Sequence, residues 1–201
     1  MYPALFSIPR PERSSRLLLV LRPLLLLPLF FWSIPYTIVM ALVHFMAWVA
    51  VIVLGRVPQI LWDFLEGYFR FTATLASYAL LLTDMYPPFN GDEEKRRAIG
   101  VLVEMPARMS RMTVLLRPLL LFPHFFFGIG YSVMFFFMYL ATAITVLVSG
   151  KMSDGQFGWM KAWFIYNARF RAYSLLLVDE YPPFNGLQPQ AAMERFPTLS
   201  E

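Results

Sequence analysis

Residues 81–91 read Leu-Leu-Thr-Asp-Met-Tyr-Pro-Pro-Phe-Asn-Gly, and residues 176–186 read Leu-Leu-Val-Asp-Glu-Tyr-Pro-Pro-Phe-Asn-Gly. The similarity extends backwards from both stretches, so that residues 11–91 align with residues 106–186 without a gap at a constant offset of 95. Self-similarity at a fixed period indicates a duplicated structural unit. We therefore divide the chain into a first repeat (1–91), a charged connector (92–105), a second repeat (106–186) and a polar tail (187–201).

The composition indicates a membrane protein. Apolar residues make up 58% of the chain and charged residues 15%, whereas soluble domains have about 45–50% and about 25%. The net charge of +4 comes with basic residues at the ends of apolar blocks. There they fit anionic lipid headgroups and membrane orientation better than nucleic acid. The chain contains no cysteine, which excludes disulfides and cysteine metal sites.

Each repeat opens with a long apolar block. In the first repeat this block covers residues 17–54, and Arg22 and His44 are its only ionisable residues. It is far longer than the roughly 20 residues that cross a bilayer, and prolines near its start remove backbone donors. We therefore expect an interfacial or re-entrant helix over 17–31, followed by a membrane-spanning helix over 34–54. The second repeat is expected to divide in the same way.

The second block of each repeat, 60–83 and 157–178, is an amphipathic helix by its spacing. Its charged side chains are Asp63, Glu66 and Arg70 in the first repeat, and Lys161, Arg169 and Arg171 in the second. Charges that face lipid are costly. Two arrangements follow: the acidic residues of one repeat face the arginines of the other, or these side chains extend to the headgroups.

The repeated ends decide the expected topology. Both repeats begin with arginines and end with the same motif, so two crossings per repeat would give both copies the same orientation. The result is an all-α integral membrane protein with two parallel tandem repeats and four spans. The positive-inside rule then places both termini in the cytoplasm. In the alternative, the second block lies flat on the membrane. We expect the connector to form a short solvated helix.

Two aspartates at equivalent positions, Asp84 and Asp179, follow helices whose C-terminal ends are electrostatically unfavourable for an acid. An arginine from the start of the same repeat would compensate and tie its two ends together. The candidates for this clasp are Arg16 and Arg22 in the first repeat, and Arg111 and Arg117 in the second. The alternatives are a lipid-phosphate contact for the arginines and a proton relay through the aspartates.

The Tyr-Pro-Pro-Phe-Asn-Gly motif predicts a helix stop, because proline cannot continue a helix and Asn-Gly favours a turn. Its aromatic residues, Tyr86 and Phe89 with Tyr181 and Phe184, are interfacial anchors or a docking element for a partner. His44 and His124 occupy non-equivalent positions, which argues against a metal or haem site. No catalytic motif occurs, so we expect no enzyme and no cofactor.

These features resemble a known family. The segments that carry the resemblance are residues 12–18, 121–124 and 81–89, and the Gly-Arg and Gly-Lys turns at 55–56 and 150–151. They are similar to an uncharacterised bacterial membrane family, the domain of unknown function numbered 4389. The resemblance covers about 5–91 and 101–186, which implies a tandem two-copy member. The family implies no activity.

The favoured function is that of a non-enzymatic scaffold or accessory subunit of a larger inner-membrane complex. Its expected partners are another integral membrane protein and anionic lipids. The alternative is a lipid- or ion-handling transporter. Its cavity would be lined by five charged residues of the second blocks, Asp63, Glu66, Arg70, Arg169 and Arg171. A third possibility is a curvature-shaping protein built on interfacial helices.

Overall fold

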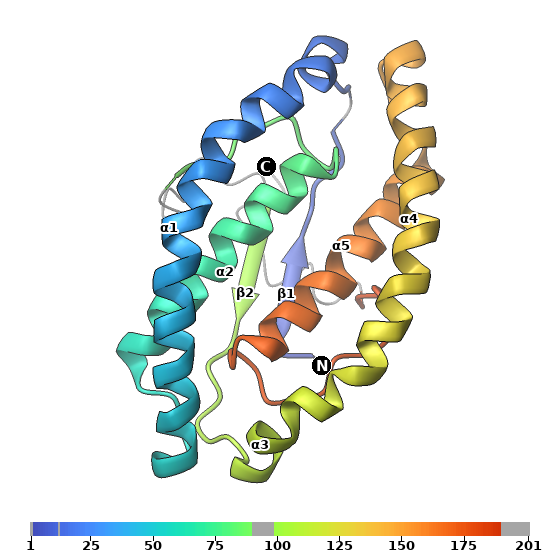
Figure 1. The fold of residues 1–201 in the computed structure, drawn as a ribbon. Coiled ribbons are helices and arrows are strands. Elements are labelled where there is room, and N and C mark those ends of the chain that lie inside the picture. The colour runs from blue at the N-terminus through green and yellow to red at the C-terminus, as the bar shows by residue number, and fades with distance from the viewer. Residues whose placement is uncertain (1, 12, 90–98, 190–201) are drawn as a thin grey trace.

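A computed structural model describes residues 2–11, 13–89 and 99–189. The elements follow in the order β1 (Ala4–Ser7), α1 (Arg16–Leu54), α2 (Gln59–Ala79), β2 (Gly100–Val103), α3 (Arg111–Leu120), α4 (Phe122–Ser149) and α5 (Asp154–Ser174). Figure 1 shows α1 and α4 as the two outer helices, with α2 and α5 between them. The protein is mostly helical, and its short sheet corrects the all-α expectation.

The two repeats are related by a pseudo-two-fold axis. Strands β1 and β2 pair antiparallel, and Phe6 lies opposite Val101. These two residues are 95 positions apart, the same offset that relates the repeats, so the axis passes through the strand pair at this position. Accordingly α1 and α4 run in opposite directions, as do α2 and α5 (Figure 1). Equivalent helices of the two repeats therefore run antiparallel, because an antiparallel strand pair relates the two copies by a two-fold rotation.

The first helix of each repeat is longer and less divided than expected. Helix α1 runs unbroken through Pro23, Pro28 and Pro35, from the Ser15 cap to Gly55. Apolar surroundings offer no water to backbone groups, so a continuous helix is favoured even though each proline lacks the N–H donor of one helical hydrogen bond. In the second repeat the helix is interrupted only at Leu121, between α3 and α4. The expected units of three separate helices are thus replaced by one long and one shorter helix.

The core lies where the sheet meets the second helices. Phe6 of β1 packs edge-to-face against Phe69 of α2 and Phe164 of α5, and all three side chains are buried. The sheet therefore covers one side of the α2–α5 pair. The second strand, 100–103, lies where the connector helix was expected, which corrects that prediction. The preceding connector residues, 90–98, lie outside the described residues.

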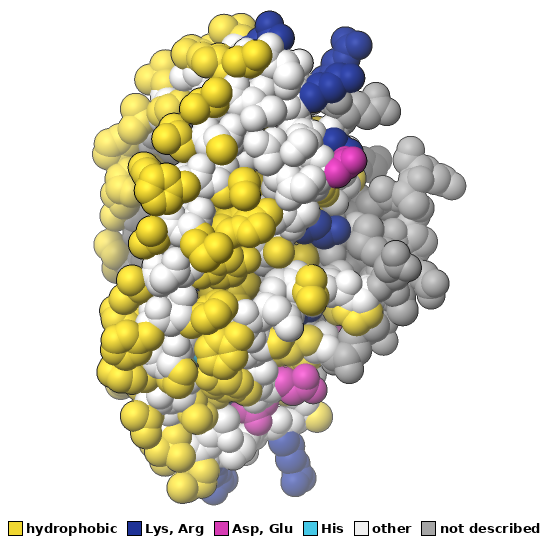
Figure 2. Space-filling view, turned by 90° about the vertical axis from the view of Figure 1, so that its right-hand side faces the viewer, with side chains coloured by type: hydrophobic (Ala, Val, Ile, Leu, Met, Phe, Trp, Pro, Cys, Tyr) yellow, Lys and Arg dark blue, Asp and Glu magenta, His cyan; other side chains and the backbone are white. Residues whose placement is uncertain are grey.

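Two stretches of the described chain, 16–54 and 111–149, are long and apolar enough to cross a membrane. Helices α2 and α5 do not meet this criterion, so the four-span layout is not supported. Large apolar side chains are exposed along the whole length of α1, α3 and α4. In Figure 2 hydrophobic side chains cover the left-hand face, which is the face turned to the reader in Figure 1.

Candidate functional site

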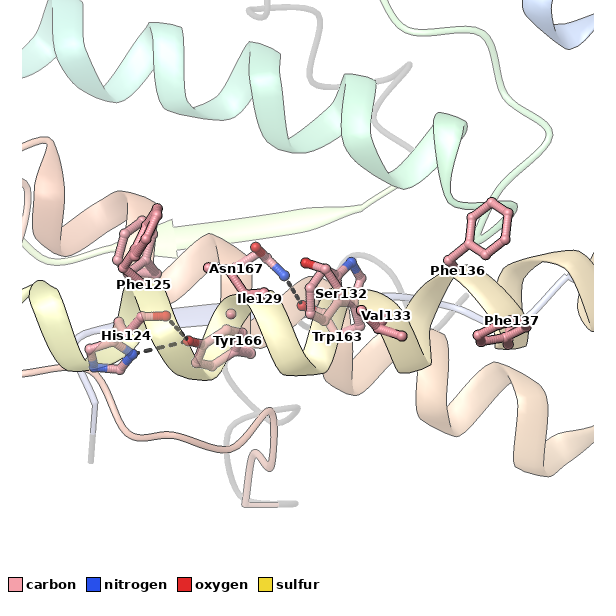
Figure 3. Close-up of a pocket in the computed structure, with 12 residues that line it drawn as sticks. His124, Phe125, Ile129, Ser132, Val133, Phe136, Phe137, Trp163, Tyr166 and Asn167 are labelled. Atoms are coloured by element: carbon pink, nitrogen blue, oxygen red, sulfur yellow. Dashed lines mark hydrogen bonds between the residues drawn. The ribbon is translucent and has the colours of Figure 1, made fainter.

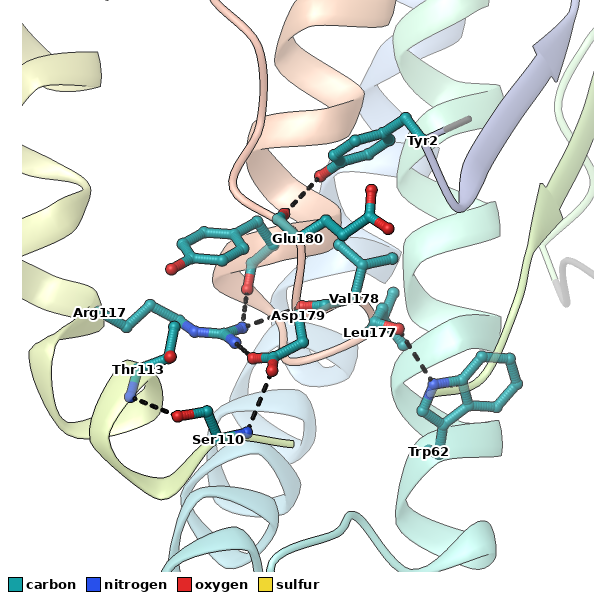
Figure 4. A network of polar contacts seen from close by, with 10 residues as sticks. Tyr2, Trp62, Ser110, Thr113, Arg117, Leu177, Val178, Asp179 and Glu180 are labelled. Atoms are coloured by element: carbon teal, nitrogen blue, oxygen red, sulfur yellow. Dashed lines mark hydrogen bonds and ion pairs between the residues drawn. The ribbon is translucent and has the colours of Figure 1, made fainter. Parts of the chain in front are cut away.

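An arginine clasp closes each repeat. In the second repeat the Nη2 atom of Arg117 lies 3.0 Å from Oδ1 of Asp179 (Figure 4). Nη1 of the same arginine donates to the carbonyls of Tyr173 and Val178, the latter at 3.3 Å. The guanidinium also lies 4.1 Å from the centre of the Tyr173 ring. Arg117 is only 3% exposed, so this buried cation has a carboxylate, two carbonyls and a ring face around it.

The first repeat contains the same clasp. Nη2 of Arg22 lies 2.7 Å from Oδ1 of Asp84, and Nη1 donates to the carbonyl of Tyr78. The guanidinium lies 4.4 Å from the Tyr78 ring centre. The pairing expected from sequence therefore forms between Arg22 and Asp84 in the first repeat, and between Arg117 and Asp179 in the second. The tyrosine was missed, although its identity at both equivalent positions was a usable signal.

The aspartates also cap the long helices. The backbone N–H of Ser15 donates to Oδ2 of Asp84 at 2.7 Å, and that of Ser110 donates to Oδ2 of Asp179 at 3.0 Å. These serines are the N-cap residues of α1 and α3. A carboxylate is favourable at a helix N-terminus, where N–H groups lack partners. The apparently unfavourable position of each acid is thus explained by the helix at the start of its own repeat.

Arg16 and Arg111 do not contact these aspartates; they connect the two repeats. Nη2 of Arg16 donates to the Val148 carbonyl at 2.6 Å, and Nη2 of Arg111 donates to the Val53 carbonyl at 2.9 Å. Both carbonyls belong to the last turn of the other repeat's long helix, where a cation is favourable. The exchange is reciprocal, as the pseudo-two-fold axis requires.

The charged residues of the second blocks do not face each other across the repeats, so that hypothesis was wrong. Asp63 accepts a hydrogen bond from Gln59 at 2.6 Å, and Glu66 pairs with Arg70 one turn later. Each acid thus has a partner one turn away on its own helix. Such a pair loses less conformational entropy than a contact between repeats.

Arg169 instead contacts residues near both ends of the described chain. It donates to the Leu187 carbonyl at 2.9 Å, and its guanidinium lies 5.2 Å from the Tyr2 ring. Burial lowers the pKa of Arg169, an effect that Tyr2 opposes. Burial also raises the pKa of Tyr2, and the nearby Arg169 opposes that shift. Arg169 therefore belongs to the packing of the N-terminal segment on α5.

The aromatic residues of the repeated motif lie partly exposed beside the long helices. The hydroxyl of Tyr86 donates to the Leu25 carbonyl at 3.2 Å, and that of Tyr181 donates to the Leu120 carbonyl at 3.1 Å. Phe184 stacks on His124 with ring centres 4.0 Å apart. The Phe89 carbonyl accepts a hydrogen bond from the indole N–H of Trp32. The motif therefore packs against its own repeat while leaving aromatic surface accessible.

Two grooves adjoin these elements. One, of about 690 Å³ between α4 and α5, has polar groups from His124, Tyr166 and Asn167 (Figure 3). The ring nitrogen Nδ1 of His124 lies 3.1 Å from the Tyr166 hydroxyl. The other groove, of about 630 Å³, lies between α2 and α5, and α1 forms one wall. Arg171 lines this second groove. Neither groove was predicted. The first lies between consecutive helices, α4 and α5, whereas the second is assembled from helices of both repeats that are distant in sequence.

The fold and clasps define a duplicated, mostly helical protein with two helices suited to a membrane. Residues 16–90 and 111–185 each match the Domain of unknown function (DUF4389). The chain belongs to this family as a two-copy member. No curated protein and no solved structure matches it.

Proposed function

We propose that this protein is a non-enzymatic scaffold or accessory subunit of a larger assembly in the bacterial inner membrane. The supporting observation is the outer surface of α1, α3 and α4, where large apolar side chains are exposed along the full length of the helices. Exposed apolar patches of this extent mark membrane or protein contacts. The buried ionisable groups of the clasps serve the fold: they are bonded to carbonyls, carboxylates and aromatic rings.

The face that carries the sheet is the proposed docking side for the protein partner. Both described chain ends meet there: the Phe6 N–H donates to the Gln188 side chain at 3.0 Å, and that side chain donates back to the Phe6 carbonyl at 2.8 Å. The same face carries charged side chains (Figure 2). Its proposed location is the cytoplasmic side, so that both termini lie in the cytoplasm.

Anionic lipid is the second proposed partner, and Arg171 is the residue that would contact it. Arg22 and Arg117 are 3% exposed and already paired, so they are poor headgroup ligands. The Arg171 side chain is exposed at the α2–α5 groove, and no hydrogen bond or ion pair joins its guanidinium to another described residue. A cation beside an apolar groove suits a phosphate with acyl chains. Its counterpart in the first repeat is Ala76.

The transporter alternative is weaker on this geometry. It requires a cavity lined by Asp63, Glu66, Arg70, Arg169 and Arg171. Of these five, only Arg171 lines either of the two grooves described above.

The test is extraction of the tagged protein from its native membranes in mild detergent, followed by mass spectrometry of bound proteins and lipids. A stoichiometric membrane-protein partner is expected. A clean particle without a protein partner contradicts the scaffold. Arg171→Ala should lower the amount of bound anionic lipid, whereas Arg56→Ala, a change of another exposed arginine outside the groove, should not.

A further inference from the structure

We infer that the protein lies in one leaflet of the bilayer, with its pseudo-two-fold axis along the membrane normal, so that neither long helix crosses the membrane. The inference deepens the proposed function and rests on its membrane location. The partner of the apolar face is then the lipid of a single leaflet, and the whole sheet-bearing face stays on one aqueous side.

Helix length supports this placement. Helix α1 has 39 residues, which at 1.5 Å per residue is about 58 Å. The hydrocarbon core of a bilayer is only about 30 Å thick. No Asp, Glu, Lys or Arg occurs between Arg22 and the end of α1, nor between Arg117 and the end of α4. The uncharged part of α1, residues 23–54, is about 48 Å long. To fit it into the hydrocarbon core, a straight helix would need a tilt of about 50°, which exceeds the upper limit of about 40° found for membrane-spanning helices.

The distribution of charge supports it independently. In Figure 2 the apolar face runs from top to bottom without a charged side chain, whereas charges lie at the two ends and along the opposite face, some near mid-height. If the long helices crossed the bilayer, the mid-height charges would lie at the depth of the hydrocarbon, where they are costly. With the helices in the membrane plane, all these charges remain in water or among headgroups. This is the distribution of an interfacial protein.

The pseudo-symmetry agrees with this orientation. An axis along the membrane normal places equivalent residues of the two repeats at the same depth. Equivalent apolar-face pairs are Leu24 with Leu119, Ile38 with Val133, and Val53 with Val148, each side chain more than half exposed. Both long helices therefore present the same surface to the same leaflet. Repeats whose helices run in opposite directions can do so only when the two-fold axis lies along the membrane normal.

The absence of native cysteine makes a topology test direct. The turns that follow α1 and α4 lie at opposite ends of the molecule (Figure 1). They carry the exposed and equivalent residues Arg56 and Lys151. We would make Arg56→Cys and Lys151→Cys separately, and treat right-side-out and inverted membrane vesicles with a membrane-impermeant maleimide. Labelling in detergent is the control for thiol reactivity.

Both thiols should react from the same side of the membrane, with at least tenfold less labelling from the other. Reaction from opposite sides overturns single-leaflet insertion but leaves a membrane scaffold intact. Recovery of the protein in the soluble fraction overturns both this inference and the membrane location of the proposed function.

A depth measurement provides a second readout. Spin labels at Leu24→Cys, Ile38→Cys and Val53→Cys sample α1 from near its start to its end. In the membrane plane all three should show similar accessibility to oxygen and little to a water-soluble relaxant. A profile that is shallow at both ends and deep at Ile38 overturns the inference, because it is the profile of a crossing helix.

Discussion

Replacing Asp84 by alanine should destabilise the protein more than any single change to its surface. The substitution leaves the guanidinium of Arg22, 3% exposed, with only the carbonyl and ring of Tyr78. It also removes the acceptor of the Ser15 N–H. Removing one partner of a buried ion pair costs about 3–5 kcal/mol. Because the Asp84 side chain is 24% exposed, we expect about 2–4 kcal/mol.

The assay is thermal unfolding in detergent micelles, followed by circular dichroism. For a chain of 201 residues the expected cost corresponds to a fall in Tm of roughly 5–15 °C. Asp179→Ala should give a similar fall, because the second clasp has the same bonds. The matched control is Asp63→Ala. It removes an exposed acid that, among the described residues, is hydrogen-bonded to Gln59 alone, and it should change stability by less than about 0.5 kcal/mol.

Substitution of Arg22, the other member of the ion pair, provides the result that could refute this reasoning. Arg22→Met breaks the same ion pair but leaves no buried cation, and Asp84 still accepts the Ser15 N–H. We therefore expect a smaller loss, of about 1 kcal/mol. The double variant should lose less than the two single losses combined. If Arg22→Met costs more than Asp84→Ala, or if Asp84→Ala behaves like Asp63→Ala, the clasp does not stabilise the fold as described.

Three further predictions concern stability measured in the same way. Gly150, at φ 71° after α4, should not tolerate alanine: Gly150→Ala should cost about 1 kcal/mol, whereas Gly128→Ala, inside α4 with open space around it, should gain up to about 1 kcal/mol. Gly186→Ala would place a methyl group against the backbone of Ala162 and should cost about 1–3 kcal/mol; an unchanged Tm would contradict this packing. Because burial raises the pKa of Tyr2 above its ordinary value of 10.0, the unfolded chain releases this proton first as the pH rises, and stability falls. Tyr2→Phe should make that alkaline fall shallower, and an identical slope would refute the effect.

Much of the local structure could be predicted from the sequence. The apolar blocks do form the long outer helices. The helix stop predicted at the repeated motif was placed too late, because α2 already ends at Ala79 and α5 at Ser174, just before Leu81 and Leu176 adopt positive φ. The Arg22–Asp84 and Arg117–Asp179 pairs could be proposed because both members recur at the same spacing. Which of several arginines would reach the aspartate could not be decided, since that depends on how α1 and α3 approach the end of their own repeat.

The sequence by itself determined that the chain is a duplication, that its long helices have apolar surfaces, and that each repeat carries a cation and an acid able to close it. Tertiary structure alone decided that the second repeat is reversed, that Arg16 and Arg111 bond to the opposite repeat, and that the apolar surfaces share one face. The physical reason is the antiparallel pairing of β1 and β2. These strands are four residues each and lie outside the aligned repeats. The helical periodicity of the repeats therefore does not predict the two-fold axis that the strand pair creates.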